Sequence, residues 1–152
     1  MDEEPEYTLD QLIQQMKVYL GSTFAAYLKS HNYHWNVEGM NFHDLHAFFS
    51  EVYNELFDSL DDIAEQIRQL GAYAPGALAR FKELSLISDE LNIPDSRGMI
   101  ETLMADNAKL METASEACEM ADELDLLGLE NYLADRVMAH SKLNWKLKSM
   151  LA

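Results

Sequence analysis

The chain has 152 residues, a single cysteine, and a formal net charge of −16 from 27 acidic and 11 basic residues. Apolar residues make up 48% of it, too many for a disordered chain, and no apolar run approaches the roughly 18 residues of a membrane span. The length fits one domain, an intramolecular disulfide is excluded, and so acidic a surface repels nucleic-acid phosphates while it attracts cations.

The first residues form an acidic tail, residues 1–7, ahead of a single domain over residues 8–152. Residues 1–10 contain five acids and no base. They have no cationic segment and no following hydrophobic stretch, so they do not resemble a secretion signal. We therefore expect a soluble, cytoplasmic protein that does not enter a membrane.

Two long helices are predicted in the first half of the chain. Thr8 and Gln11 form a capping-box signature that starts a helix, and its apolar stripe ends near residues 36–39. Asn41 is expected to cap the second helix, which runs over residues 41–70.

The second half predicts a connection and two more long helices. Residues 77–87 form a short helix within the connection, and Pro94 stops any helix there. Apolar stripes predict helices over residues 100–124 and 129–151, with Gly128 at the break between them. The fold class is thus all-α, a four-helix bundle with one long crossover that carries a short helix, which is the ferritin-like connectivity.

Four of the five histidines lie within HNYHWNVEGMNFHDLH, residues 31–46. Histidine is the commonest metal-ligating side chain, so the cluster suggests a metal site. His34 and His46 lie on either side of the short turn between the first two helices, so their side chains can meet. The chain contains no Glu-x-x-His, which disfavours a two-metal site built within one subunit.

A second group of metal-ligand residues occurs in DSLDDIAE, where Asp61 and Glu65 face the same way one helical turn apart. Asp61 lies fifteen residues beyond His46 on the same helix, which is roughly 22 Å at 1.5 Å per residue. Either the two groups act separately, or an antiparallel second copy of the chain brings its carboxylates to these histidines and makes two equivalent sites. The sequence favours a metal site at a dimer interface.

The two motifs together resemble the Dps family of mini-ferritins ("DNA-binding protein from starved cells"). HNYHWNVEGMNFHDLH fits the family pattern H-W-N-x-x-G-x-x-F-x-x-x-H, and DSLDDIAEQIRQLG fits the following D-x-x-x-E-R/Q. ALARFKELSLI looks like the family's short helix in the long connection, and HSKLNWKLKSML looks like its C-terminal helix. The resemblance covers residues 8–152.

This resemblance implies a hollow dodecamer that binds ferrous iron at two-fold interfaces, oxidises it with hydrogen peroxide or oxygen, and stores ferric mineral, which protects against oxidative stress. It assigns His34 and His46 to one subunit's share of each metal site, and Asp61 and Glu65 to its neighbour's share. Such a mixed donor set suits iron(II) but also accepts zinc, cobalt or manganese. Trp35 matches the family's electron donor or radical trap beside the metal, and interface packing is the simpler alternative.

One position departs from the family pattern. Ser50 stands where a carboxylate usually follows the second histidine by four residues, and Glu51 is next to it. The second iron position is therefore poorer, water-filled, or served by a shifted Glu51. The same departure encourages an alternative, a catalytically weak or silent assembly of this fold.

The remaining histidines and the cysteine have ordinary explanations. The family motif requires neither His31 nor His43, so each is expected to be a polar or interface residue. His140 is expected to be a hydrogen-bonded core histidine, and Cys118 a small buried hydrophobe.

Acidic residues near the start of the last helix are candidates for a cation pore, with a charged loop as the alternative; they are Asp122, Glu123, Asp125, Glu130 and Asp135. DNA compaction is a further alternative function, but family members that bind DNA commonly use a basic terminal tail. The acidic N-terminus therefore predicts that DNA binding is absent or weak.

Overall fold

The structure is a computed structural model that describes residues 4–152. It consists of five helices, which are α1 (Leu9–Asn36), α2 (Phe42–Gln69), α3 (Leu78–Leu84), α4 (Ser96–Glu123) and α5 (Leu127–Leu151). The described residues form no strand, and none of their helices is long and apolar enough to cross a membrane. The all-α fold is therefore confirmed.

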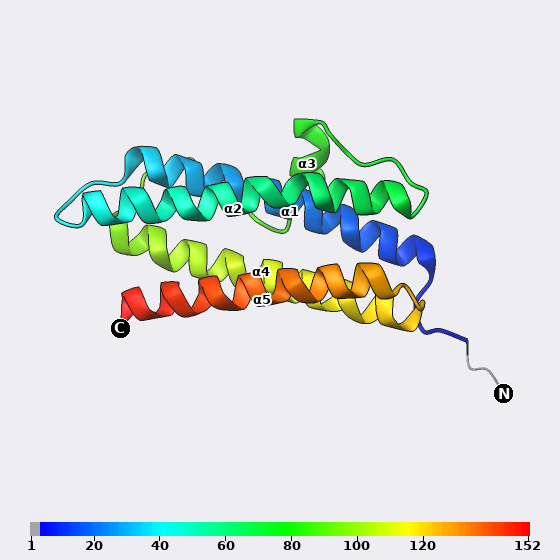
Figure 1. Cartoon of the computed structure of the whole chain (residues 1–152). Helices are drawn as coiled ribbons and strands as arrows, with labels where there is room; N and C mark the ends of the chain where they lie inside the picture. Colours follow the sequence, from blue (N-terminus) through cyan, green and yellow to red (C-terminus); the bar gives the residue numbers. More distant parts are fainter. Residues whose placement is uncertain (1–3) are drawn as a thin grey trace.

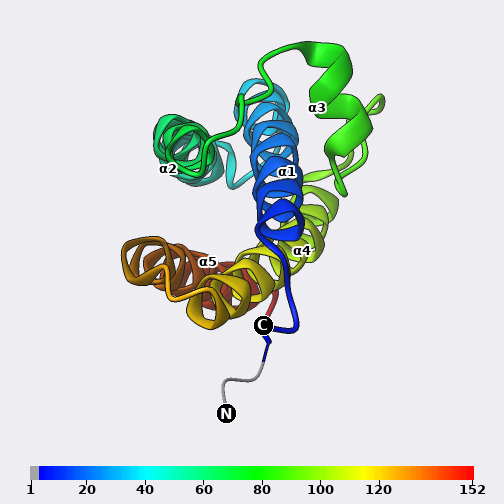
Figure 2. The ribbon, with the colours of Figure 1, turned by 90° about the vertical axis from the view of Figure 1, so that its right-hand side faces the viewer.

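The four long helices form two antiparallel pairs, α1 with α2 and α4 with α5, and α1 also packs on α4 (Figure 1). The short helix α3 lies in the long connection between α2 and α4. It packs on the side of α1 away from α2, as the view along the bundle shows (Figure 2). This is the predicted four-helix bundle with one long crossover and a short helix.

Local signals predicted where α1 and α2 begin, but only α1 has the predicted side-chain cap. The Thr8 hydroxyl accepts a hydrogen bond from the Gln11 backbone N–H at 3.2 Å, and the Gln11 side chain accepts one from the Thr8 N–H at 2.8 Å. Asn41 precedes α2 as predicted, but its side chain makes no capping hydrogen bond. Its φ of −97° and ψ of 18° depart from the extended backbone that normally aims a capping side chain at the helix.

The predicted break at Gly128 is wrong. The chain turns at residues 124–126, where Asp125 has a φ of +58° and the Leu126 N–H donates to the Ala121 carbonyl at 2.9 Å. Aspartate tolerates this left-handed conformation better than most residues do, so the turn needs no glycine. Gly128 therefore lies inside α5.

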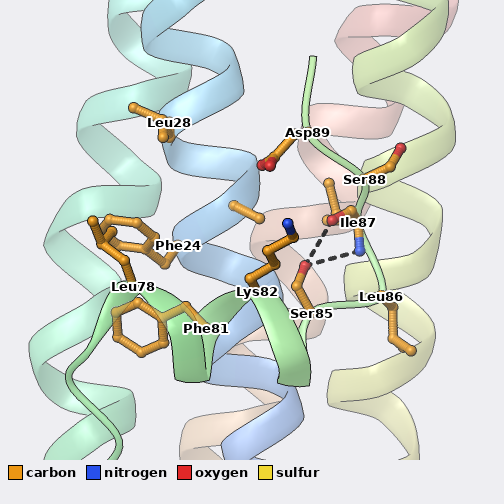
Figure 3. Close-up of a pocket in the computed structure, with 11 residues that line it drawn as sticks. Phe24, Leu28, Leu78, Phe81, Lys82, Ser85, Leu86, Ile87, Ser88 and Asp89 are labelled. Atoms are coloured by element: carbon orange, nitrogen blue, oxygen red, sulfur yellow. Dashed lines mark hydrogen bonds between the residues drawn. The ribbon is translucent and has the colours of Figure 1, made fainter. Parts of the chain in front are cut away.

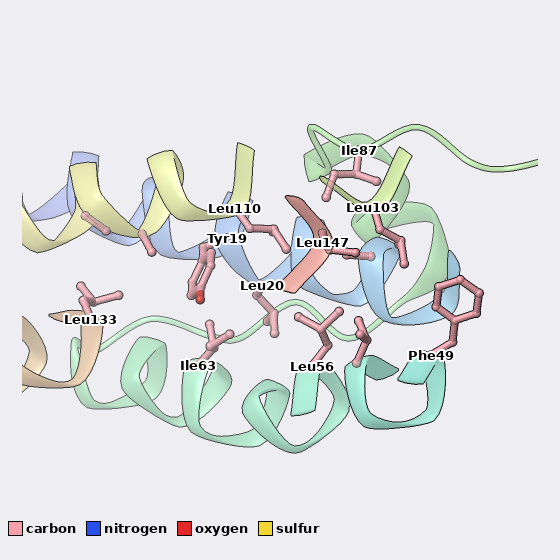
Figure 4. Packing of buried hydrophobic residues seen from close by; sticks show 14 of the residues in the cluster. Tyr19, Leu20, Phe49, Leu56, Ile63, Ile87, Leu103, Leu110, Leu133 and Leu147 are labelled. Atoms are coloured by element: carbon pink, nitrogen blue, oxygen red, sulfur yellow. The ribbon is translucent and has the colours of Figure 1, made fainter. Parts of the chain in front are cut away.

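The core between the helices is built from side chains of all four long helices and the crossover, as predicted from their stripes (Figure 4). Full burial of each large apolar side chain contributes about 1.5–3 kcal/mol. Cys118 is only partly buried against this core, and its thiol donates to the Glu130 carbonyl at 3.4 Å. The labelled core residues include Tyr19, Leu20, Phe49, Leu56, Ile63, Leu103, Leu110, Leu133 and Leu147.

A polar chain crosses the core at His140, which is 1% exposed. Arg136 Nε donates to the Tyr19 hydroxyl at 3.0 Å, so that hydroxyl donates to His140 Nε2 at 2.8 Å. The His140 Nδ1–H then donates to the Asn107 side-chain oxygen at 2.9 Å, and Arg136 pairs with Glu55 on α2. Burial, with the Arg136 charge, lowers the pKa of His140 to about 3. His140 is thus the satisfied core histidine that was expected.

Candidate metal centre

His34 and His46, the imidazole pair, hold each other in a reciprocal arrangement. His34 lies in the last turn of α1 and His46 near the start of α2. The His34 Nδ1 contacts the His46 carbonyl oxygen at 2.6 Å, and the His46 Nδ1 contacts the His34 carbonyl oxygen at 2.7 Å. The two rings stack with centroids 3.8 Å apart and planes 16° apart.

These contacts fix the protons of the imidazole pair. A carbonyl oxygen only accepts hydrogen bonds, so both Nδ1 atoms carry hydrogen and both Nε2 atoms keep their lone pairs when the rings are neutral. Metal-binding histidines are usually prepared in this way, with one ring nitrogen donating to the protein and the other facing the metal. The pair is therefore chemically ready to supply two nitrogen ligands.

The short connection between α1 and α2 brings the pair together. The Val37 N–H caps α1 on the Tyr33 carbonyl at 3.0 Å, and the Phe42 N–H returns to the Gly39 carbonyl at 3.1 Å. Gly39 adopts a φ of +113°, which side chains rarely permit. The chain thus reverses within residues 37–41 and places His46 opposite His34.

His31 lies beside the pair among aromatic rings. Its ring stacks on Tyr53 at 3.9 Å and lies 4.0 Å from the Trp35 ring, and its Nδ1 is hydrogen-bonded to the Tyr27 hydroxyl at 3.1 Å. Burial, followed by the nearby His34, lowers the pKa of His31. Trp35 is 60% exposed and packs on His31, whose ring centroid is 6.0 Å from that of His34.

Asp61 and Glu65, the carboxylate pair, lie far from the imidazole pair in one subunit. Both side chains are exposed on α2, which runs unbroken from Phe42 to Gln69. The helical rise therefore separates Asp61 from His46 by about 22 Å. Within residues 4–152, no three side chains of His, Cys, Asp or Glu come together in a way that could hold a metal.

Ser50 and Glu51, next along α2, face different neighbours. The Asn54 side-chain amide donates to the Ser50 carbonyl at 2.9 Å and lies 3.3 Å from the Ser50 hydroxyl. The Glu51 carboxylate lies 4.0 Å from Lys146 Nζ and lines a groove between α2 and α5. Glu51 is therefore directed to α5 and not to the imidazole pair.

An apolar surface on α1, α2 and α3 was missed from the sequence. The Phe24 and Phe81 rings stack at 4.7 Å beside a groove between α1 and α3 that Leu28 and Leu78 also line (Figure 3). Leu28 and Leu78 are 45% and 73% exposed, and Phe57 on α2 is 53% exposed. The spacing of Phe24, Leu28, His31 and Trp35 along one side of α1 was the available signal.

The candidate pore residues lie around the α4 to α5 turn, at the end of the bundle opposite the α1 to α2 turn (Figure 1). Asp122 and Glu123 end α4, Asp125 lies in the turn, and all three are exposed. Asp135 is exposed on α5, and Glu130 is partly buried. These acids are therefore remote from the imidazole pair of the same subunit.

Comparison with known proteins defines the class of this bundle. The ferritin-like domain family matches residues 10–152. The crystal structure of a Dps protein from Bacillus brevis superimposes with a TM-score of 0.90 at 27% identity, over 97% of this chain and 99% of that one. The Vibrio cholerae Dps protein, described as a member of a broad superfamily of ferritin-like diiron-carboxylate proteins, gives 0.91 at 26% identity, over 95% and 91%.

A relative found by sequence supports a narrower assignment. The DNA protection during starvation protein 1 of Deinococcus radiodurans is 29% identical over 156 residues, which cover 98% of this chain and 72% of that protein. The chain therefore belongs to the ferritin-like family, and Dps proteins are among its structural neighbours and sequence relatives. The resemblance inferred from the histidine and carboxylate motifs is confirmed.

Proposed function

We propose that this protein is a ferroxidase that oxidises ferrous iron at sites between subunits, with hydrogen peroxide as the main oxidant, and stores the ferric product. The observation that carries the proposal is the imidazole pair. Its Nδ1 atoms are both engaged by carbonyl oxygens, and within residues 4–152 neither Nε2 atom has a hydrogen-bond partner. Two neutral nitrogen donors with nearby carboxylates suit iron(II), and they also accept zinc, cobalt or manganese.

The carboxylates come from a second subunit. An antiparallel partner related by a two-fold axis places Asp61 and Glu65 of the partner subunit against the imidazole pair, and the same operation completes a second, equivalent site. The two-fold axis then crosses α2 about midway between the imidazole pair and the carboxylate pair, close to Phe57. Phe57 is an exposed apolar side chain in the single subunit, and such a contact covers it.

The chemistry consumes two ferrous ions for each peroxide. Each ion gives up one electron, and hydrogen peroxide takes both electrons and two protons to become two molecules of water. The reaction releases no hydroxyl radical, and so it protects the cell from oxidative damage. We propose that Trp35 supplies an electron to an incompletely reduced oxidant; its ring lies 4.0 Å from that of His31, which in turn lies 6.0 Å from that of His34.

The wider assembly follows from the same assignment. We propose a cytoplasmic dodecameric shell, with Asp122, Glu123 and Asp125 contributing to a pore that draws in cations. The net charge of −16 supports cation attraction and disfavours contact with DNA phosphates. DNA binding is proposed to be absent or weak, so that no retarded band is seen in a gel at moderate salt.

A second candidate function is an assembly of this fold with little or no iron oxidation. The observation that favours it is the neutral Ser50 one helical turn from His46, hydrogen-bonded to Asn54. Oxidation of ferrous iron by peroxide and by oxygen, followed at equal protein concentration, separates the two candidates. A rate no greater than that of buffer supports the silent assembly.

The intersubunit character is tested by complementation. One variant carries His34→Ala with His46→Ala, and a second carries Asp61→Asn with Glu65→Gln. Each is expected to be inactive alone. Co-expression in equal amounts makes half of the dimers mixed, and each mixed dimer regains one intact site, so that about one quarter of the wild-type rate returns.

The control for this experiment mixes the two inactive proteins after each has assembled separately, where no exchange of subunits and no recovery are expected. If the co-expressed protein assembles, as verified by its mass, but regains no iron oxidation, the site is not shared between subunits.

A further inference from the structure

Arg68, in the last turn of α2, differs from the other three arginines of the chain. Each of those three pairs with a glutamate, and the pairs are Arg80 with Glu83, Arg97 with Glu101 and Arg136 with Glu55. Glu65 lies three residues before Arg68, and residues three apart on a helix are neighbours, with the acid favoured on the N-terminal side. Within residues 4–152, however, Arg68 forms no ion pair with a carboxylate.

The turn after α2 holds the Arg68 side chain instead. Gly71 adopts a φ of +93°, a conformation that suits glycine, and the Ala72 N–H returns to the Ile67 carbonyl at 3.3 Å. Arg68 Nη1 donates to the Ala72 carbonyl at 3.1 Å, and Arg68 Cζ lies 4.8 Å from the centre of the Tyr73 ring. A guanidinium within about 6 Å of an aromatic face is attracted to it. The turn thus offers Arg68 two partners that are not carboxylates.

Arg68 nevertheless shares a face of α2 with the carboxylate pair. At 3.6 residues per turn, Asp61, Glu65 and Arg68 lie within about 60° of one another around the helix. A guanidinium paired with Glu65 would occupy carboxylate oxygens and add a positive charge next to the proposed metal position. Both effects oppose metal binding, because the guanidinium and the metal ion compete for the same lone pairs and repel each other.

We propose that Tyr73 is a positioning residue that holds Arg68 away from the carboxylate pair and so keeps Asp61 and Glu65 available to a metal ion. This proposal rests on the proposed intersubunit site, to which the carboxylate pair contributes. The Tyr73 side chain is 83% exposed, so burial in the core does not account for its position over the guanidinium. Tyr73 acts through Arg68 and touches neither the metal ion nor the oxidant.

Cobalt(II) is a suitable probe because it accepts nitrogen and oxygen ligands and is not oxidised during a titration under argon. The assembled protein, verified by its mass, is titrated calorimetrically in the presence of excess Mg²⁺, which occupies weak surface carboxylates. Tyr73→Ala is expected to weaken tight cobalt binding about two- to fivefold, which corresponds to the loss of an exposed cation–π contact. Tyr73→Phe keeps the ring and is expected to bind cobalt as tightly as the unaltered protein does.

Removal of Arg68 separates positioning from general damage to the turn. Arg68→Gln, added to Tyr73→Ala, removes the competing cation and is expected to restore the cobalt affinity to that of Arg68→Gln alone. In peroxide-driven iron oxidation, Tyr73→Ala should raise the KM for ferrous iron by the same factor and leave kcat unchanged. The reason is that Arg68 competes with the binding of the metal ion and not with its oxidation.

The outcomes distinguish this proposal from the proposed site. Equal cobalt affinity in Tyr73→Ala and Tyr73→Phe, or a loss that Arg68→Gln does not restore, overturns the role of Tyr73 but leaves the intersubunit site standing. No tight cobalt binding in the unaltered protein, or binding that survives His34→Ala with His46→Ala, overturns the proposed site and this inference with it.

Discussion

The imidazole pair and His140 are two uses of histidine in one bundle. All three rings engage Nδ1, the pair with backbone carbonyls and His140 with the Asn107 side chain. They differ at Nε2, which is hydrogen-bonded to the Tyr19 hydroxyl in His140 and has no partner among the described residues in the pair. A histidine that uses both nitrogens can hold helices together but cannot bind a metal without breaking a buried hydrogen bond.

Position in the bundle explains this difference. His140 lies in the middle of α5 among buried side chains, where each polar atom must find a partner within the protein. The imidazole pair lies where α1 ends and α2 begins, and both rings are only partly buried. Partial burial leaves a ligand position open to ions and to a second subunit. His140 therefore stabilises the fold, whereas the imidazole pair is available to bind a metal ion.

Removing His140 is expected to have the largest effect on stability. His140→Ala leaves a cavity and removes the partners of Tyr19 and Asn107, so it should lower the free energy of unfolding by about 4 kcal/mol. Urea unfolding at a fixed protein concentration measures the change. Tight cobalt binding by the folded protein should be unaltered, and a loss of that binding without destabilisation would break the distinction between the two kinds of histidine.

Removing one member of the imidazole pair should have the opposite profile. His46→Ala deletes a proposed metal ligand and the support of His34, so peroxide-driven iron oxidation should fall by about 100-fold or more. The free energy of unfolding should fall by only about 1 kcal/mol, because one partly exposed hydrogen bond is lost. Stopped-flow absorbance and urea unfolding of the same preparation provide both values. An unchanged oxidation rate would count against the proposed centre.

The low pKa of His140 predicts a pH-dependent stability. The folded-state value is about 3, below the ordinary 6.5, so the unfolded chain binds a proton that the folded chain does not. This contribution is fully present above pH 6.5 and is lost as the pH falls toward 3. The loss amounts to about 2 kcal/mol at pH 5. Urea unfolding at pH 7.5 and pH 5 should show a smaller difference in His140→Gln than in the unaltered protein.

Sequence reasoning succeeded where a contact is local. Thr8 and Gln11 are three residues apart, and the capping box they form depends on little else. The meeting of His34 and His46 followed from the short turn between two helices. Asn41 failed as a cap because its backbone dihedral angles are set by how that turn packs, which the residue type alone does not determine.

The polar pairs between helices could not be predicted from the sequence for another reason. Lys29 and Asp106 form a buried ion pair at 2.8 Å although 77 residues separate them, and Arg136 reaches Glu55 from another helix. Helical periodicity shows which side of a helix is buried but not which residue lies opposite it. The same limit applies to Asp61, because the histidines with which we propose it binds a metal belong to another subunit.

The smallest expected effect tests whether geometry or mere clustering defines the metal centre. His43 is as close to His46 in sequence as His31 is to His34, but its side chain is exposed, and in the described part of the chain its ring nitrogens make no hydrogen bond. His43→Ala should therefore leave the cobalt affinity and the rate of iron oxidation within about twofold of the unaltered protein, because no ligand and no support of a ligand is removed. His46→Ala, prepared in parallel, supplies the contrasting loss. A comparable loss in His43→Ala would mean that the ring turns toward the metal in the assembled protein, and the centre would then comprise three imidazoles from one subunit instead of two.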